Sequence, residues 1–179
     1  MMTLAKALSS AYVPVSAAIV QGDIADCINA SAKEVGVFGH GYTYSGHPLG
    51  CAVASKVIDI YVRDKIFDHA ATVGDYLQAR LKEFADHPLV GEVSGVGMIG
   101  AVELVADKAS KKPFDGMKVG QFCAKAAEDN GLVIRPLGGN RVAVCPPLII
   151  ETTHVDELIE KFGAALNLTL DWVTAEKLV

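Results

Sequence analysis

Lys6 is the first residue of this chain whose type and setting suit chemistry. It stands in "TLAKALSSAY", between the apolar pairs Leu4-Ala5 and Ala7-Leu8. Apolar surroundings disfavour the charged form of an amine and leave a nucleophile that can add to an aldehyde. The alternative is a lysine near a chain terminus with its head group in water, which is where most lysines lie.

The loop "HGYTYSGHPLG", residues 40–50, offers hydrogen-bond donors for an anion. The hydroxyls of Thr43 and Ser45, with backbone N–H groups made accessible by Gly41 and Gly46, could hold a phosphate at the start of the following helix. The same groups could instead cap that helix, which is the common use of Ser and Thr there. Both interpretations remain open from the residues alone.

Arg135 ends the apolar run "LVIR" and is followed by Pro136 and a glycine-containing turn. An arginine at a strand end can present its planar fork to a carboxylate. The alternative is a surface arginine paired to a nearby acid. Arg141 competes for the same role, although its place before "VAVCPP" favours a structural one.

Metal binding is not expected. His40 and His47 share the polar loop, but their spacing and the lack of nearby carboxylates do not fit the usual ligand patterns. No CxxC spacing occurs, and buried free thiols in a reducing compartment, hence a cytoplasmic location, are expected. The four cysteines are Cys27, Cys51, Cys123 and Cys145.

The composition is that of an ordinary globular protein. The chain has 179 residues, of which 51% are hydrophobic and 21% charged, with a net charge of −5. This charge gives no reason to expect nucleic-acid binding. No uncharged apolar run reaches the roughly 18 residues of a membrane span, and "MMTLAKALSS" is too short for a secretory signal.

The elements that position these residues can be read from the pattern. We expect a strand at 13–20, a short helix at 23–34, and a helix from Gly50 to Arg63 that is apolar nearly all round and therefore buried. An amphipathic helix at 64–86 follows.

The remaining sequence predicts a compact α+β unit over 88–179. It contains strands within 90–105 and at 132–135 and 141–146, and helices at 116–130 and 152–172, the last with a capping-box-like start at Thr153. The expected organisation has three parts. Residues 1–46 are the end of a larger domain, 47–87 are long interdomain helices, and 88–179 form a small C-terminal domain.

Three segments together resemble a known family. "TLAKALSSAYVPVSAAIV", "GHGYTYSGHPLGCAVA" and "GLVIRPLGGNRVAVCPPLIIE" resemble the class III aminotransferases, pyridoxal-phosphate enzymes of fold type I, and within them the ω-amino acid:pyruvate type. The resemblance runs along essentially the whole chain. It implies an α/β fold and pyridoxal 5'-phosphate as cofactor.

The resemblance also assigns roles. The family's cofactor lysine falls on Lys6, although Ala7 stands where the family usually has glycine. The threonine of "TYSGHP" is Thr43, which would reach the phosphate of a partner subunit's cofactor, with Ser45 in the same loop. Arg135 matches the arginine that binds the substrate carboxylate.

The resemblance implies small-molecule partners, an amine or ω-amino acid donor and a keto acid such as pyruvate. It further implies a homodimer, or a complex with a missing N-terminal half, because family members carry a long portion before the lysine. That portion supplies the acid at the pyridine nitrogen and most of the phosphate cup. The chain is therefore expected to be inactive alone. The alternative from another class is a non-catalytic α/β domain that acts as a structural or binding unit.

Overall fold

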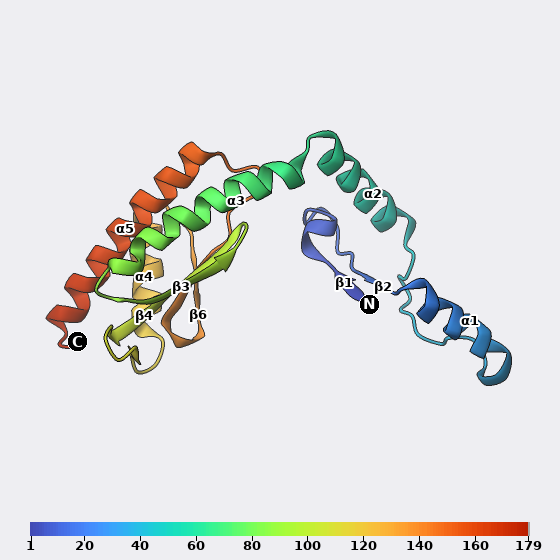
Figure 1. The fold of residues 1–179 in the computed structure, drawn as a ribbon, viewed down its shortest axis with the longest axis horizontal. Helices are drawn as coiled ribbons and strands as arrows, with labels where there is room; N and C mark the ends of the chain where they lie inside the picture. The colour runs from blue at the N-terminus through green and yellow to red at the C-terminus, as the bar shows by residue number, and fades with distance from the viewer. Residues whose placement is uncertain (179) are drawn as a thin grey trace. The chain divides into compact units, whose positions relative to one another are not determined.

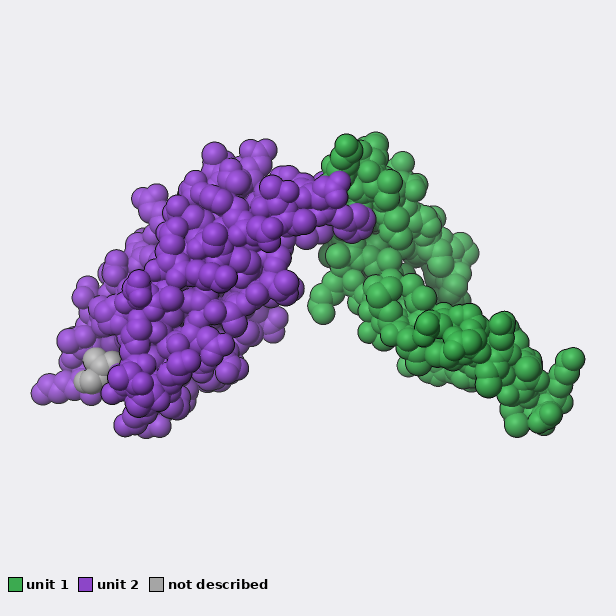
Figure 2. All heavy atoms as spheres, in the orientation of Figure 1, with its two compact units in different colours: residues 1–65 green, residues 66–179 purple. Residues whose placement is uncertain are grey.

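The computed structural model describes residues 1–178 and forms two compact units, Met1–Lys65 and Ile66–Val179 (Figures 1 and 2). The division falls between two helices. The predicted mixture of helices and strands, an α/β class, is confirmed.

The first unit is mostly helical. Its two short strands pair in antiparallel fashion, with Met2 opposite Ile19 and Leu4 opposite Ala17. Its elements are β1 (Met2–Leu4), the 3₁₀ helix η1 (Lys6–Leu8), β2 (Ala17–Ile19), α1 (Gly22–Val35) and α2 (Pro48–Arg63). The predicted strand at 13–20 is therefore shortened to three residues, whereas the helix expected at 23–34 forms within one residue of each bound.

The first unit has almost no interior. Ser9, Ala54 and Val57 are its buried residues. The prediction that residues 50–63 form a helix is confirmed, but the prediction that this helix is buried is wrong for this chain. Leu49 is 61% exposed, Ile58 43% and Val62 66%. The apolar surface is present, and nothing in the described residues covers it.

The second unit has a sheet in the order β3-β4-β7-β6, antiparallel throughout, with β5 pairing to β4. Three consecutive strands follow α3 and η2, and α4 separates them from β6 and β7. The elements are α3 (Ile66–Lys82), η2 (Glu83–Asp86), β3 (Val90–Val96), β4 (Ile99–Asp107), β5 (Lys112–Pro113), α4 (Lys118–Asp129), β6 (Arg135–Leu137), η3 (Gly138–Asn140), β7 (Arg141–Val144) and α5 (Thr152–Ala175).

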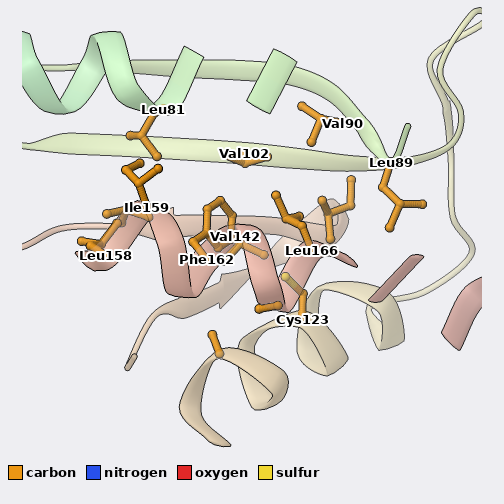
Figure 3. Packing of buried hydrophobic residues seen from close by; sticks show 14 of the residues in the cluster. Leu81, Leu89, Val90, Val102, Cys123, Val142, Leu158, Ile159, Phe162 and Leu166 are labelled. Carbon is orange, nitrogen blue, oxygen red and sulfur yellow. The ribbon is translucent and has the colours of Figure 1, made fainter. Parts of the chain in front are cut away.

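The core of the second unit lies between one face of the sheet and the helices α3, α4 and α5. Figure 3 shows Phe162 and Leu166 of α5 packed beside strand residue Val142 and Cys123 of α4. Because successive side chains of a strand point to opposite faces, burying Val142 and Val144 directs Arg141 and Ala143 to the other face.

The strand predicted at 132–135 is wrong in its position, since pairing begins only at Arg135. The backbone before it is used differently. The Leu132 N–H donates to the carbonyl of Ala127 at 2.9 Å, and Gly131 takes φ +76°, which together close the C-terminus of α4. The capping box expected at Thr153 does not form either, because α5 begins after Glu151 without a side-chain cap.

Gly74 sits where α3 crosses the turn between β3 and β4. A Cβ at this position would lie 2.8 Å from two backbone atoms of Gly97. Alanine favours helix over glycine by about 1 kcal/mol, but overpacking against backbone costs typically about 1–3 kcal/mol. We expect Gly74→Ala to lower the free energy of unfolding of the second unit, measured by urea denaturation. Asp75→Ala, on the exposed side of α3, is the control and should change it by less than about 0.5 kcal/mol.

His87 should make the second unit less stable in mild acid. Its Nδ1 accepts the N–H of Leu89 at 3.3 Å. Burial of the ring lowers the pKa of His87, and the neighbouring Lys108 lowers it further, while Asn167 opposes the shift. The folded state therefore disfavours protonation relative to the unfolded chain, where a histidine titrates near about 6.5. The stabilising effect is full above that pH and is lost as the pH falls below it.

The measurement is the free energy of unfolding between pH 7.5 and 5.5 for the wild type and His87→Gln, which stays neutral throughout. We expect a steeper loss in the wild type. Equal slopes for the two proteins would contradict the assignment.

Candidate functional site

Lys6 lies in a strained segment. It has φ +53° at the start of η1, and Ser10 and Ala11 also have positive φ, 50° and 63°. Non-glycine residues in this region cost on the order of 1–3 kcal/mol each and gather at functional sites. Lys6 is exposed rather than enclosed by its apolar neighbours, so the surroundings expected from the sequence are not present in this chain. Its amine makes no hydrogen bond or ion pair within residues 1–178.

A hydrogen bond fixes the lysine segment against α2. The Tyr61 hydroxyl donates to the carbonyl of Ala7 at 2.9 Å. Tyr61 is near the C-terminal end of α2, whereas the polar loop joins the N-terminal end at Pro48. At about 1.5 Å per residue, the 13 positions from Pro48 to Tyr61 (61 − 48) span roughly 20 Å. The structure therefore does not bring Lys6 and Thr43 of one chain together.

The polar loop retains free donors. Ser45 Oγ accepts the N–H of Tyr42 at 2.9 Å, so this hydroxyl is partly used within the loop. His47, not Ser45, is the N-cap of α2, through a long 3.5 Å contact from the Gly50 N–H to Nδ1. Within the described chain, the Thr43 hydroxyl and the N–H groups of Thr43, Tyr44 and Gly46 have no acceptor. An exposed group of this kind suits an anion such as phosphate.

A cavity opens beside the loop. It has a volume of about 780 Å³ and is lined by residues 13–16 and by parts of 42–51, including Ser45 and His47. Neither Lys6 nor Thr43 lines it. Ser45 is exposed and lines this cavity within the first unit.

Arg135 occupies the exposed face of β6, the edge strand of the second unit's sheet. Its ladder partner is Ala143, and its guanidinium makes no hydrogen bond or ion pair within the part of the chain that the structure describes. Arg141, on the same face, contacts Glu103, with Nη2 3.6 Å from Oε1. Arg135 therefore has a free fork for a carboxylate, whereas Arg141 is already paired, as its structural reading predicted.

Asn140 is a buried polar residue that the sequence analysis missed. Its side chain bonds three backbone groups from the loop before α4 and the start of α4. The signal available in the sequence was an asparagine directly after two glycines, which is typical of a left-handed turn position.

Other reactive groups lack the setting of a site. Burial raises the pKa of Cys123 to about 11, which leaves that thiol protonated and inert. Residues 1–178 contain no group of three or more histidine, cysteine or acidic side chains placed to hold a metal ion. No helix in the same range is long and apolar enough to cross a bilayer.

The chain matches the family model for aminotransferase class III over residues 1–166. It is 45% identical over 174 residues to an uncharacterized aminotransferase of Sinorhizobium fredii, an alignment that covers 96% of this chain and 37% of the relative. It is 40% identical over 176 residues to the putrescine–pyruvate aminotransferase of Pseudomonas aeruginosa, covering 98% of this chain and 38% of that protein.

The three-dimensional structure is also similar to that of a transaminase. The crystal structure of the omega transaminase from Pseudomonas jessenii in complex with PMP superposes with a TM-score of 0.90 at 40% identity, covering 97% of this chain and 38% of that one. The chain thus spans 37–38% of the length of these relatives.

The exposed apolar side of α2 should drive self-association. Ile58 and Val62 lie four residues apart on the same side of the helix and are both exposed. Soluble monomers rarely leave large apolar patches open. We expect the molar mass from sedimentation or light scattering to rise with concentration above that of one chain, and the double variant Ile58→Glu/Val62→Glu to weaken the rise. Lys56→Glu is the control, because it makes the same change in net charge at an exposed position on the other side of α2. A wild-type chain that stays monomeric at working concentration would contradict this expectation.

Proposed function

Since the chain belongs to the class III aminotransferases, we propose that it forms part of a pyridoxal-phosphate-dependent transaminase that moves an amino group from an amine or ω-amino acid to pyruvate or a similar keto acid. The name of the Pseudomonas aeruginosa relative, which pairs putrescine with pyruvate, supports both substrate classes. The observation that carries the proposal is the unengaged guanidinium of Arg135 beside the ion-paired Arg141.

The residues of this chain suit the cofactor. Bound pyridoxal phosphate supplies an electron sink for the bond broken at the substrate carbon. Lys6 would hold it covalently through the ε-amine, and the same amine would afterwards move the proton between substrate and cofactor carbons. The exposed, unpaired amine and the strained backbone at Lys6 support this role.

Thr43 would bind the cofactor phosphate of a second subunit. One chain keeps Lys6 and the polar loop at opposite ends of α2, so the loop's free N–H groups and hydroxyls cannot serve the lysine of the same chain. Ser45 would add a donor, because its O–H remains available while its oxygen accepts from Tyr42. The near absence of buried residues in the first unit supports a homodimer in which this unit is covered.

Arg135 would hold the acceptor carboxylate with two parallel hydrogen bonds. It would leave that position for a donor with no carboxylate beside its amine. Pro136 restricts the backbone of Arg135 to extended conformations, so the movement belongs to the side chain. Cys123 is buried as predicted, whereas Cys27, Cys51 and Cys145 are exposed and the prediction that they are buried is wrong. The unpaired state of all four thiols supports a reducing, cytoplasmic location.

The proposal is tested in a hybrid enzyme. Residues 1–179 replace the matching stretch of the Pseudomonas aeruginosa putrescine–pyruvate aminotransferase, and alanine formation from pyruvate is measured with putrescine and added pyridoxal phosphate. We expect turnover that Lys6→Ala abolishes. The 179-residue chain by itself should show little or none. Turnover by the chain alone that Lys6→Ala removes would contradict the expected inactivity.

Arg135→Lys should raise the KM for pyruvate in the hybrid. A lysine cannot form the paired hydrogen bonds of a guanidinium, and losing one charge-assisted contact costs typically about 1.5–3 kcal/mol, or roughly tenfold to a hundredfold in acceptor efficiency. Arg141→Lys is the matched control and should have a much smaller effect. If Arg141→Lys removes pyruvate use while Arg135→Lys leaves it unchanged, the carboxylate anchor is the other arginine.

A further inference from the structure

The turn that follows Arg135 is fastened by one buried amide. Asn140 has a relative exposure of 0%. Its Oδ1 accepts the Gly120 N–H at 3.0 Å, and its Nδ2 donates to the carbonyl of Gly116 at 2.8 Å and, less closely, to that of Phe114 at 3.4 Å. All three partners lie around the start of α4.

This amide also caps α4. The residue before the helix, Met117, makes no side-chain cap, so the early N–H groups of α4 need acceptors from elsewhere. Asn140 supplies one to Gly120. The contact is close, because a Cβ on Gly120 would lie 3.1 Å from the Asn140 Cα.

The backbone of the turn is adapted to this contact. Gly139 has φ +73° and Asn140 has φ +55°. Asparagine tolerates this left-handed conformation better than most residues other than glycine. Sequence and structure therefore agree that the position selects a residue that combines a left-handed backbone with an amide side chain.

Helix α4 holds the chain on both sides of Arg135. On the N-terminal side, the Gly131 and Leu132 N–H groups donate to the carbonyls of Glu128 and Ala127, each at 2.9 Å. On the C-terminal side, Asn140 is fastened to Gly120. The segment that carries Arg135 thus runs between two attachments to one helix.

β6 needs such attachments. It has three residues and lies at the end of the strand order, so β7 is its ladder partner and, within residues 1–178, its other edge is unpaired. A short edge strand opens readily when only one ladder holds it.

We propose that Asn140 is a positioning residue for Arg135: its amide fixes the β6–β7 turn to α4 and so holds the Arg135 backbone while the side chain engages the acceptor carboxylate. The inference rests on the proposed role of Arg135. It assigns Asn140 no contact with the substrate.

The kinetic test compares two acceptors in the hybrid enzyme: pyruvate, and butanal, which has no carboxylate. Asn140→Gly keeps the left-handed backbone and removes the amide. We expect its KM for pyruvate to rise about tenfold, the size of one lost hydrogen-bond contribution, with kcat and the use of butanal little changed. Gly120→Ala should give the same pattern without altering Asn140, because its Cβ displaces the turn.

Val73→Ala is the control for a general loss of stability, since Val73 is buried in the same core on α3, far along the chain from the turn. It should leave the KM for pyruvate unchanged. An equal loss with pyruvate and butanal in Asn140→Gly would make Asn140 merely structural and overturn the proposal. An effect of Arg135→Lys without one of Asn140→Gly would also overturn it, while leaving the proposed function intact. No effect of Arg135→Lys would reject the role of Arg135 itself.

A second readout needs no activity. Amide hydrogen exchange is measured on the 179-residue chain, with β3 and β4 as internal reference. We expect exchange of the Arg135 and Leu137 amides, the two N–H groups of β6, to accelerate about tenfold in Asn140→Gly, with the reference strands unchanged. Unchanged exchange at these two amides would show that Asn140 does not hold this strand and would overturn the proposal.

Discussion

The alternation of side chains along the strands of the second unit determines where its chemistry can occur. Val102, Val142 and Val144 are buried against the helices. The neighbouring positions must then face the other way, and these include Arg141 and Arg135. A slip of one residue in the ladder would bury both guanidinium groups and expose the valines. Packing of the apolar core therefore fixes the register of the strands. The register in turn decides which polar side chains lie on the opposite face of the sheet.

The two units differ in what they contain: the second has the hydrophobic core, and the first has the lysine segment and the polar loop. Residues 66–178 hold the hydrophobic cluster, from Val73 on α3 to Val173 on α5. Residues 1–65 hold the strained lysine segment and the loop with free donors, and only three of these described residues are buried. Strain of this kind persists only where surrounding structure holds it. The lysine segment is held by the Tyr61 hydrogen bond, by the Ser9 hydroxyl, which donates to the carbonyl of Val13 at 2.6 Å, and by the β1–β2 pairing. Few buried side chains surround it, and under the proposed function other polypeptide covers this unit.

The helices were predictable because their apolar periodicity and end signals are local. The helices expected at 23–34 and 50–63 are examples, since each forms within two residues of its predicted bounds. The strand predicted at 132–135 was misplaced, because apolar composition does not reveal that the Leu132 N–H donates to the carbonyl of Ala127 at the end of α4. The prediction that α2 is buried was wrong for this chain, because the apolar sequence of a helix does not show whether another segment covers it.

The candidate site residues could be proposed from their residue types, but their positions relative to one another could not be, and their roles stay predictions. Lys6, Thr43, Ser45 and Arg135 could each be singled out from their neighbours in the chain. The distinction between Arg135 and Arg141 depends on Glu103, which is distant in sequence and adjacent only through the β4–β7 ladder. Asn140 escaped notice because its three partners also come from a separate segment.

The length of α2 has a genetic consequence under the proposed dimer. Each reaction centre would combine the lysine of one chain with the loop of the other, because the helix holds these two features apart within a chain. A population carrying one allele defective at Lys6 and another defective at Thr43 would then assemble some mixed dimers. In these, both lesions fall in one centre and the second centre is intact. Two alleles that are each inactive when alone would restore part of the activity when present together, so heterozygosity would rescue what neither homozygote can perform.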